Sequence, residues 1–436
     1  MTDAAQPAVG SVRAPLTAQQ VAMEARLKKR HRAETWFKAQ GLAAIIVAMV
    51  FLVVLVGRIV GQGYSTFETH TLSVPVYLNP ERIDTSDLEG VNYDYIVAEA
   101  MMKKLGVVDD DLGLVSGKVM DLTSRDLGFQ LLNMLKADKS LIGKTITVTG
   151  PFKADADLYF KGEIKRSTPQ EDRKLDDQQL NWLDQLKNDG SVKSGFNFAF
   201  FTHSDSTEPE QAGVLGAVVG SAMMLLITAL IAVPMGVMAA VYLEEFAPKN
   251  RWTDVIEVNI NNLAAVPSIV YGLLGLALFI NWLHVPRSSP LVGGLVLALM
   301  ALPTVIIATR SALKAVPPSI REAALGVGAS KTQTVFHHVL PLAMPGVMTG
   351  AILSLAHALG ETAPLLMIGM VSFVPGVPEG FTGAATVLPV QVFIWENASE
   401  RAFHERTAAA IIVLLVFMIV MNAAAVILRR RFERRW

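Results

Sequence analysis

The sequence predicts a mainly α-helical protein that crosses a membrane six times and carries one inserted domain of mixed α and β structure. Hydrophobic residues make up 52% of the 436 residues, and the mean hydropathy is +0.40. This composition is too apolar for an ordinary soluble protein. Six apolar blocks are each long enough to cross a bilayer, and an acid-rich stretch without such a block separates the first two.

The first 60 residues combine a basic tail with the first apolar block. Residues 1–40 are polar and rich in lysine and arginine, so the positive-inside rule predicts a cytoplasmic N-terminal tail. Residues 41–60 form the first predicted transmembrane helix, and Arg58 near its far end can reach the interface. No small-x-small cleavage site follows closely, so we expect an uncleaved anchor rather than a secretory signal.

Residues 61–210 are expected to form the inserted domain, on the periplasmic side. Their length suffices for one domain. Residues 126–135 have helical spacing and residues 144–148 alternate like a strand, which predicts an α+β fold. The chain has no cysteine, which excludes thiolate zinc sites, disulfides and thiol catalysis. We predict no catalytic residue and no metal site.

Residues 211–428 carry the other five predicted transmembrane helices. Their ranges are 212–243 with a kink at Pro234, 260–283, 291–311, 346–373 and 408–428. Six crossings place most short-loop lysines and arginines, and the basic tail 429–436, on the cytoplasmic side. The sequence therefore predicts a multi-pass membrane protein with both termini cytoplasmic.

A polar hairpin at residues 315–345 interrupts the apolar pattern on the predicted cytoplasmic side. Ser319 with Glu322, and Ser330 with Gln333, have the form of capping boxes for two short helices. We expect a turn at Gly328 and a helix end at Pro341. In one interpretation Glu322 only caps its helix and Ala323 and Ala324 are ordinary helix formers. In the other, these small residues let the helix enter a groove of a cytoplasmic partner.

The fifth apolar block contains ionisable residues, which are costly in a membrane and often functional. His357 and Glu361 are four residues apart and can pair on one helical face. Either they satisfy each other, or with Gly360 and Thr362 they line a translocation path.

Two further polar groups near span ends leave their roles open. Arg310, at the inner end of the fourth block, can anchor the interface or supply positive charge to the path. Asn259, Asn261 and Asn262 can line a path or cap a helix.

The hairpin resembles the EAA-loop signature of ABC importer permeases. The matching residues are Glu322, Ala323, Ala324, Gly328, Leu340 and Pro341. His338 stands where the signature has isoleucine. The resemblance implies a type I ABC importer permease fold and a loop that docks on an ATPase subunit. The chain itself has no GxxxxGK[ST] phosphate loop, so we expect it to bind no cofactor, with ATP and Mg used by the partner ATPase.

Three longer strings are similar to the phosphate-specific permeases of the PstA family. They are Ala240–Asn250, Asn262–Phe279 and the ALGETAPLL string that begins at Ala358. The resemblance implies phosphate import with a PstC-like permease, a PstB-like ATPase dimer and a PstS-like binding protein. Members commonly have arginine where His357 stands. The insert resembles an extra domain of some proteobacterial members. A permease for phosphonate, sulfate or molybdate, and a membrane sensor with a periplasmic ligand domain, remain alternatives.

Overall fold

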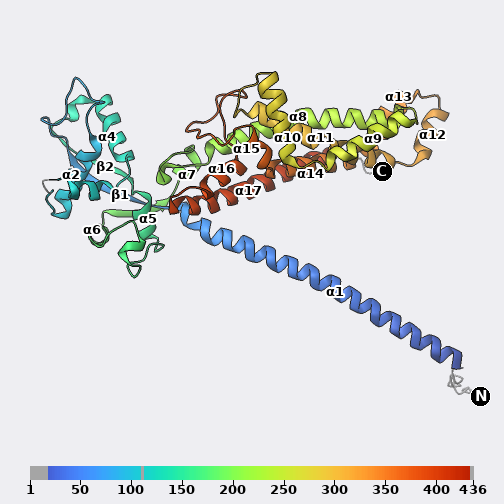
Figure 1. The fold of residues 1–436 in the computed structure, drawn as a ribbon, viewed down its shortest axis with the longest axis horizontal. Helices are drawn as coiled ribbons and strands as arrows, with labels where there is room; N and C mark the ends of the chain where they lie inside the picture. Colours follow the sequence, from blue (N-terminus) through green and yellow to red (C-terminus); the bar gives the residue numbers. More distant parts are fainter. Residues whose placement is uncertain (1–17, 110–111, 433–436) are drawn as a thin grey trace, which may run out of the picture. The chain divides into compact units, whose positions relative to one another are not determined.

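The computed structural model describes residues 18–109 and 112–432 (Figure 1). It divides into two compact units, residues 1–58 and residues 59–436. Helix α1 runs over Ala18–Gly63, so the polar stretch from residue 18 onward is helical and continuous with the first predicted span. The second unit contains the insert and the remaining apolar helices. The expectation of a mainly α-helical protein is confirmed.

The insert is built from short helices around a small sheet, as an α+β domain should be. After η1 (Tyr64–Phe67), the sheet has the order β2-β1-β3 among the described residues, and both pairings are antiparallel. The expected helix at 126–135 is α4, and the expected strand at 144–148 lies in β2. The elements are β1 (Glu68–Tyr77), α2 (Tyr93–Leu105), α3 (Leu114–Met120), α4 (Asp126–Ala137), β2 (Thr145–Pro151), α5 (Ala154–Phe160), α6 (Asp177–Asn188), β3 (Val192–Phe196) and α7 (Ala199–Thr202).

One apolar core holds the insert together. Strand β1 alternates so that Leu72, Val74 and Val76 are fully buried, which is the period-two pattern of a sheet with one covered face. They belong to one cluster with Leu131 of α4 and Leu183 of α6. The insert therefore has a core of its own.

The described residues contain five helices long and apolar enough to cross a membrane, or six if one bent pair counts as a single span. Of the five single helices, α1 contains the first predicted span. The other four contain the second, fourth, fifth and sixth predicted spans. Those four are α8 (Leu215–Val241), α11 (Pro290–Lys314), α14 (Leu340–Gly360) with the residues before it, and α17 (Arg401–Phe432). The chain is a multi-pass membrane protein.

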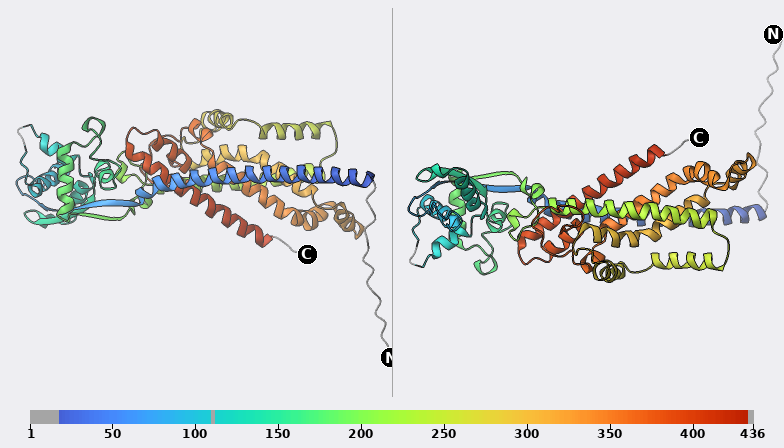
Figure 2. Two further views of the ribbon diagram at one scale, coloured as in Figure 1. Left: turned by 90° about the horizontal axis from the view of Figure 1, so that it is seen from below. Right: turned by 90° about the horizontal axis from the view of Figure 1, so that it is seen from above.

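The third predicted span, 260–283, is not one straight helix. Helix α9 (Arg251–Ala264) ends before Pro267, and α10 (Ser268–Gly275) continues through η6 (Leu276–Trp282) at an angle of 101°. Figure 2 shows the break: α9 is seen from its side where α10 is seen almost along its axis. Proline lacks the amide hydrogen that a continuous helix needs, and residues before it avoid the α conformation.

The predicted boundaries of the fifth span are also wrong at both ends. Pro341 does not end a helix, because α13 (Lys331–Gln333), the π-helical turn η7 (Thr334–Val339) and α14 follow one another without a gap. The wider turn changes the hydrogen-bond register just before the proline. At the other end the helix stops at Gly360 rather than at residue 373, and the short α15 (Ala363–Met367) starts anew.

Small residues bring the membrane helices close together. A Cβ added to Gly350 of α14 would lie only 2.2 Å from the Cβ of Ala308 of α11. Close backbone approach of this kind stabilises helix pairs in lipid, where no hydrophobic drive exists between them.

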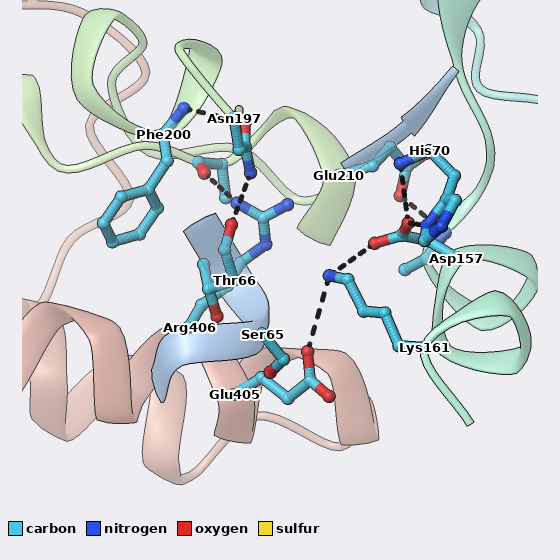
Figure 3. Close-up of polar contacts among 12 residues, drawn as sticks. Ser65, Thr66, His70, Asp157, Lys161, Asn197, Phe200, Glu210, Glu405 and Arg406 are labelled. Atoms are coloured by element: carbon cyan, nitrogen blue, oxygen red, sulfur yellow. Dashed lines mark hydrogen bonds and ion pairs between the residues drawn. The ribbon is translucent and has the colours of Figure 1, made fainter. Parts of the chain in front are cut away.

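A buried charge cluster joins the insert to the last helix of the core. We name His70, Asp157, Lys161, Glu210 and Glu405 the junction cluster (Figure 3). The Lys161 ammonium lies 2.6 Å from Asp157 and 3.7 Å from Glu405, and its side chain is only 8% exposed. The ring Nδ1 and the backbone N–H of His70 both lie 2.9 Å from Asp157. Lys161 thus links α5 of the insert to α17 of the core.

The pKa values of two carboxyl groups in the junction cluster are shifted in opposite directions. Burial alone would raise the pKa of Asp157, but hydrogen bonds from His70 and the charge of Lys161 hold this pKa below its ordinary value. Burial raises the pKa of Glu210 to about 7, and nearby Glu208 adds to the effect. One oxygen of Glu210 accepts a bond from the backbone N–H of Ala154 at 3.2 Å, and the other has no partner among the described residues.

Glu210→Gln should remove a pH dependence from stability. Because the folded-state pKa of Glu210 lies above the ordinary value of 4.5, stability should fall as pH rises from about 4.5 to about 7. We expect the Gln variant to be more stable than the native chain at pH 8 by roughly 1–3 kcal/mol, and equal to it at pH 4.5. Thermal unfolding of the detergent-solubilised chain measures this difference.

Glu171→Gln, a change at an exposed residue of the same insert, is the matched control and should leave the pH profile of the native chain intact. An identical profile for the native chain and the Glu210 variant would contradict the assignment.

Candidate functional site

The polar hairpin is a helix–turn–helix that projects beyond the apolar helices. Helix α12 (Pro318–Gly326) is followed by Gly328, whose φ of +88° suits glycine and closes the turn. The capping box of Ser330 and Gln333 is formed. The box expected from Ser319 and Glu322 is not, because α12 already begins at Pro318, with Pro317 at the cap position. Glu322 therefore has no capping role in the described structure.

The tip of the hairpin exposes an apolar surface beside Glu322. Leu325 is 51% exposed and Val327 is 86% exposed, and Glu322 and Ala323 are exposed with them. Ala324 instead faces inward and is buried. Exposed apolar side chains on a short polar hairpin are typical of a surface that meets another protein.

The base of the hairpin is fastened by Arg321, which sequence analysis missed. Its guanidinium lies 2.6 Å from the carboxylate of Glu245, at the end of the second span. It also donates to the carbonyl oxygens of Val316 at 2.8 Å and Leu313 at 3.0 Å. Leu313 lies in the last turn of α11 and Val316 follows that helix, so the Arg321 cation lies at the negative end of the helix dipole. The adjacent acids Glu244 and Glu245 at the end of an apolar block were the signal that could have found it.

Arg310 of α11 belongs to a second group of ion pairs, separate from that of Arg321. Its guanidinium is 2.8 Å from Glu257 of α9 and 3.4 Å from Glu244, and Lys314 is 3.7 Å from the same Glu244. The Arg310 side chain is 12% exposed. The structure thus gives Arg310 two carboxylate partners, and a role for it in a translocation path stays a prediction.

His357 and Glu361 do pair, as their spacing predicts. The ring Nε2 of His357 is 3.3 Å from the Glu361 carboxylate, and the histidine side chain is 70% exposed while that of Glu361 is 19% exposed. Glu361 has extended backbone, since α14 has just ended at Gly360. A Cβ at Gly360 would meet nothing within 4 Å, so this face of the chain is open.

The segment that follows Gly360 packs against α10 of the bent third span. The carbonyl of Thr362 accepts bonds from the N–H groups of Leu365 and Leu366 and starts α15. A Cβ added to Gly272 of α10 would lie 2.7 Å from Pro364, so the two segments touch backbone to backbone. His357, Gly360, Glu361 and Thr362 are therefore brought together at one helix end.

The three asparagines of α9 do not cap that helix. The cap is Asn250, whose side chain accepts bonds from the N–H groups of Trp252 and Thr253. Asn259, Asn261 and Asn262 are exposed in the second half of α9. The three asparagines therefore do not cap the start of α9, which was one of the two alternatives. The other alternative, that they line a translocation path, stays a prediction.

The two halves of the chain match two different protein families. Residues 232–436 match the family described as "Binding-protein-dependent transport system inner membrane component". Residues 24–170, most of the insert and the helix before it, match a domain of unknown function, DUF3333. The hairpin and the break at Gly360 both lie within the first match.

Curated relatives include permeases, and we name residues 232–436, the range of the family match, the permease half after them. The "Probable ABC transporter permease protein YqgI" of Bacillus subtilis is 37% identical over 40% of this chain and 58% of its own length. The "Phosphate transport system permease protein PstA 1" of Mycobacterium tuberculosis is 40% identical over 39% of this chain and 56% of its own. The "Phosphate transport system permease protein PstA" of Pasteurella multocida is 34% identical over 37% of this chain and 57% of its own length. The chain thus spans less than two thirds of the relatives it matches.

A solved structure of the MetNI methionine ABC transporter in an inward-facing conformation aligns with 50% of this chain and 95% of its own, at 18% identity and a TM-score of 0.42. Residues 232–436 are thus similar to the binding-protein-dependent transport family, and the chain is 34–40% identical to the PstA permeases of Mycobacterium tuberculosis and Pasteurella multocida over 37–39% of its length.

Proposed function

We propose that this chain is the permease subunit of an ABC importer that moves inorganic phosphate across a bacterial inner membrane. The observation that carries the proposal is the similarity of this chain to named phosphate transport permeases, together with a family match over residues 232–436 that includes the exposed hairpin. The hairpin would dock on a PstB-like ATPase dimer, which uses ATP and Mg. A PstC-like permease would complete the path, and a PstS-like protein would deliver phosphate.

The arrangement of charges supports coupling through the hairpin. Arg321 links α12 to Glu245 of the second span and to the carbonyl oxygens at the end of α11. A displacement of the hairpin by a docked ATPase would therefore act on two spans at once. Such rigid-body transfer is how alternating access works in transporters built from packed helices.

The path itself would pass the helix end at Gly360. A carboxylate alone repels an anion, but the Glu361 carboxylate is partnered by the imidazole ring of His357. The pair can present a polar surface of low net charge to phosphate. In the proposed arrangement of six membrane spans, the insert would lie on the periplasmic side and both termini would lie in the cytoplasm.

The substrate is tested by radiolabelled phosphate uptake in a host strain that lacks this gene, with and without the restored chain. We expect uptake to return with the native chain. Uptake that returns for phosphonate, sulfate or molybdate but not for phosphate would show a different oxyanion. Copurification with a kinase in place of an ATPase would favour the membrane sensor.

Glu322→Lys should abolish uptake while the chain stays in the membrane. The reversed charge lies on the exposed surface beside Leu325 and Val327, so ATPase binding should be lost in copurification. Glu379→Lys, at an exposed loop position outside the hairpin, is the matched control and should keep both activities. Normal uptake with Glu322→Lys would remove the docking role.

Glu361→Gln should reduce uptake at least tenfold without loss of ATPase binding, because it removes the carboxylate that pairs with His357. The chain offers a second histidine–glutamate pair, His404 with Glu396 at 3.6 Å, which lies outside the fifth span. Glu396→Gln should therefore leave uptake unchanged. If both variants transport normally, Glu361 has only a structural role.

A further inference from the structure

A group of aromatic side chains, four of them exposed and one partly buried, lies at the foot of the insert. We name Tyr64, Phe67, Phe196, Phe198 and Phe201 the aromatic collar. Tyr64 and Phe198 are each 70% exposed, Phe196 is 52% exposed and Phe201 is 38% exposed. Concentrated exposure of large apolar side chains marks a surface that binds something other than water.

The collar is ordered by its own ring contacts. The rings of Phe67, Phe196 and Phe201 are stacked in pairs, with centroids 5.7–6.5 Å apart. Phe198 packs edge-on against Phe196 at 4.9 Å. The four phenylalanine rings of the collar therefore form one continuous surface.

The collar lies at the level where the membrane-spanning segments end. The first apolar block ends at Val60, and Tyr64 follows four residues later, at about 6 Å along a helix that rises 1.5 Å per residue. A Cβ added to Gly63 would lie 2.8 Å from the backbone of Ala408 and Ala409, where the last apolar block begins.

A second anchor fixes the collar at the same level. Phe200, between Phe198 and Phe201, is fully buried and shares a core with Val214 at the start of α8 and Ala409 of α17. It also approaches Trp395, with ring centroids 6.4 Å apart. Phe200 thus places the collar beside the start of α8 and the N-terminal part of α17.

We propose that the aromatic collar inserts into the lipid headgroup region of the leaflet next to the insert, and holds the foot of the insert against the bilayer. The headgroup region adds roughly 5–8 Å on each side of the hydrocarbon core, which matches the position of Tyr64. Aromatic side chains are enriched at this depth. The partner is a lipid surface, because the collar is continuous with the ends of three lipid-exposed segments. The proposal does not depend on the transported substrate.

Single-cysteine labelling tests the collar directly, because the native chain contains no cysteine. Nitroxide labels at Tyr64→Cys and Phe198→Cys would be compared with a label at Val108→Cys, which is 87% exposed and belongs to the insert away from the spans. The full chain, with any subunits that stay bound, is placed in nanodiscs of phosphatidylethanolamine and phosphatidylglycerol. Collision rates with oxygen, which partitions into lipid, and with a water-soluble nickel chelate are then measured by electron paramagnetic resonance.

We expect the oxygen-to-nickel ratio at Tyr64 and Phe198 to exceed that at Val108 severalfold. A ratio equal to that of Val108 would show the collar in water and would overturn the proposal. Low collision rates with both reagents would show that a protein surface covers the collar, which would also overturn it. Because the labelled side chains are largely exposed, the substitutions should not disturb folding, and gel filtration of each variant checks this.

Discussion

Backbone amides and carbonyls that lie in hydrocarbon must find their hydrogen-bond partners within the protein, and this requirement sets the form of the permease half. It makes the spans helical and restricts irregular backbone to places that protein covers. The breaks at Val266–Pro267 and at Glu361–Thr362 meet this condition together, because Gly272 after the first break packs on Pro364 after the second. The helices that follow the two breaks, α10 and α15, therefore contact each other.

Charged groups in the permease half follow the same rule. Arg310 and Arg321 each have carboxylate partners, and those partners are adjacent glutamates at the end of the second span. Two neighbouring residues, Glu244 and Glu245, thereby serve two different helices, α11 and α12. A charge left without its partner at these buried positions would cost several kcal/mol, so these contacts define one arrangement of the hairpin base.

Much of the architecture could be predicted from the sequence. Apolar length located the spans, since a helix needs about 20 residues to cross a bilayer, and alternation located β2. The residues at which helices begin and end were harder to predict from the sequence. The capping pattern of Ser319 and Glu322 was overridden by Pro317 and Pro318 one step earlier, and a π turn carried the helix past Pro341. Local pattern cannot reveal such shifts, because they depend on hydrogen-bond register.

The candidate site was predictable only where its residues are close in sequence. The pairing of His357 with Glu361 follows from helical spacing, whereas Lys161 and Glu405 are far apart in the chain and meet only through the fold. The same is true of Arg321 and Glu245. Contacts between distant residues require knowledge of which surfaces face each other, which a single sequence does not contain.

The Lys161–Glu405 contact bears on how the insert and the permease half depend on each other. Excision of the insert would leave the half-buried acid of α17 without its cation, and would uncover the apolar surface that Phe200 shares with Val214 and Ala409. The insert is therefore not a detachable module. Removal of the insert alone would therefore leave the start of α17 with a charge and an apolar surface that lack their partners.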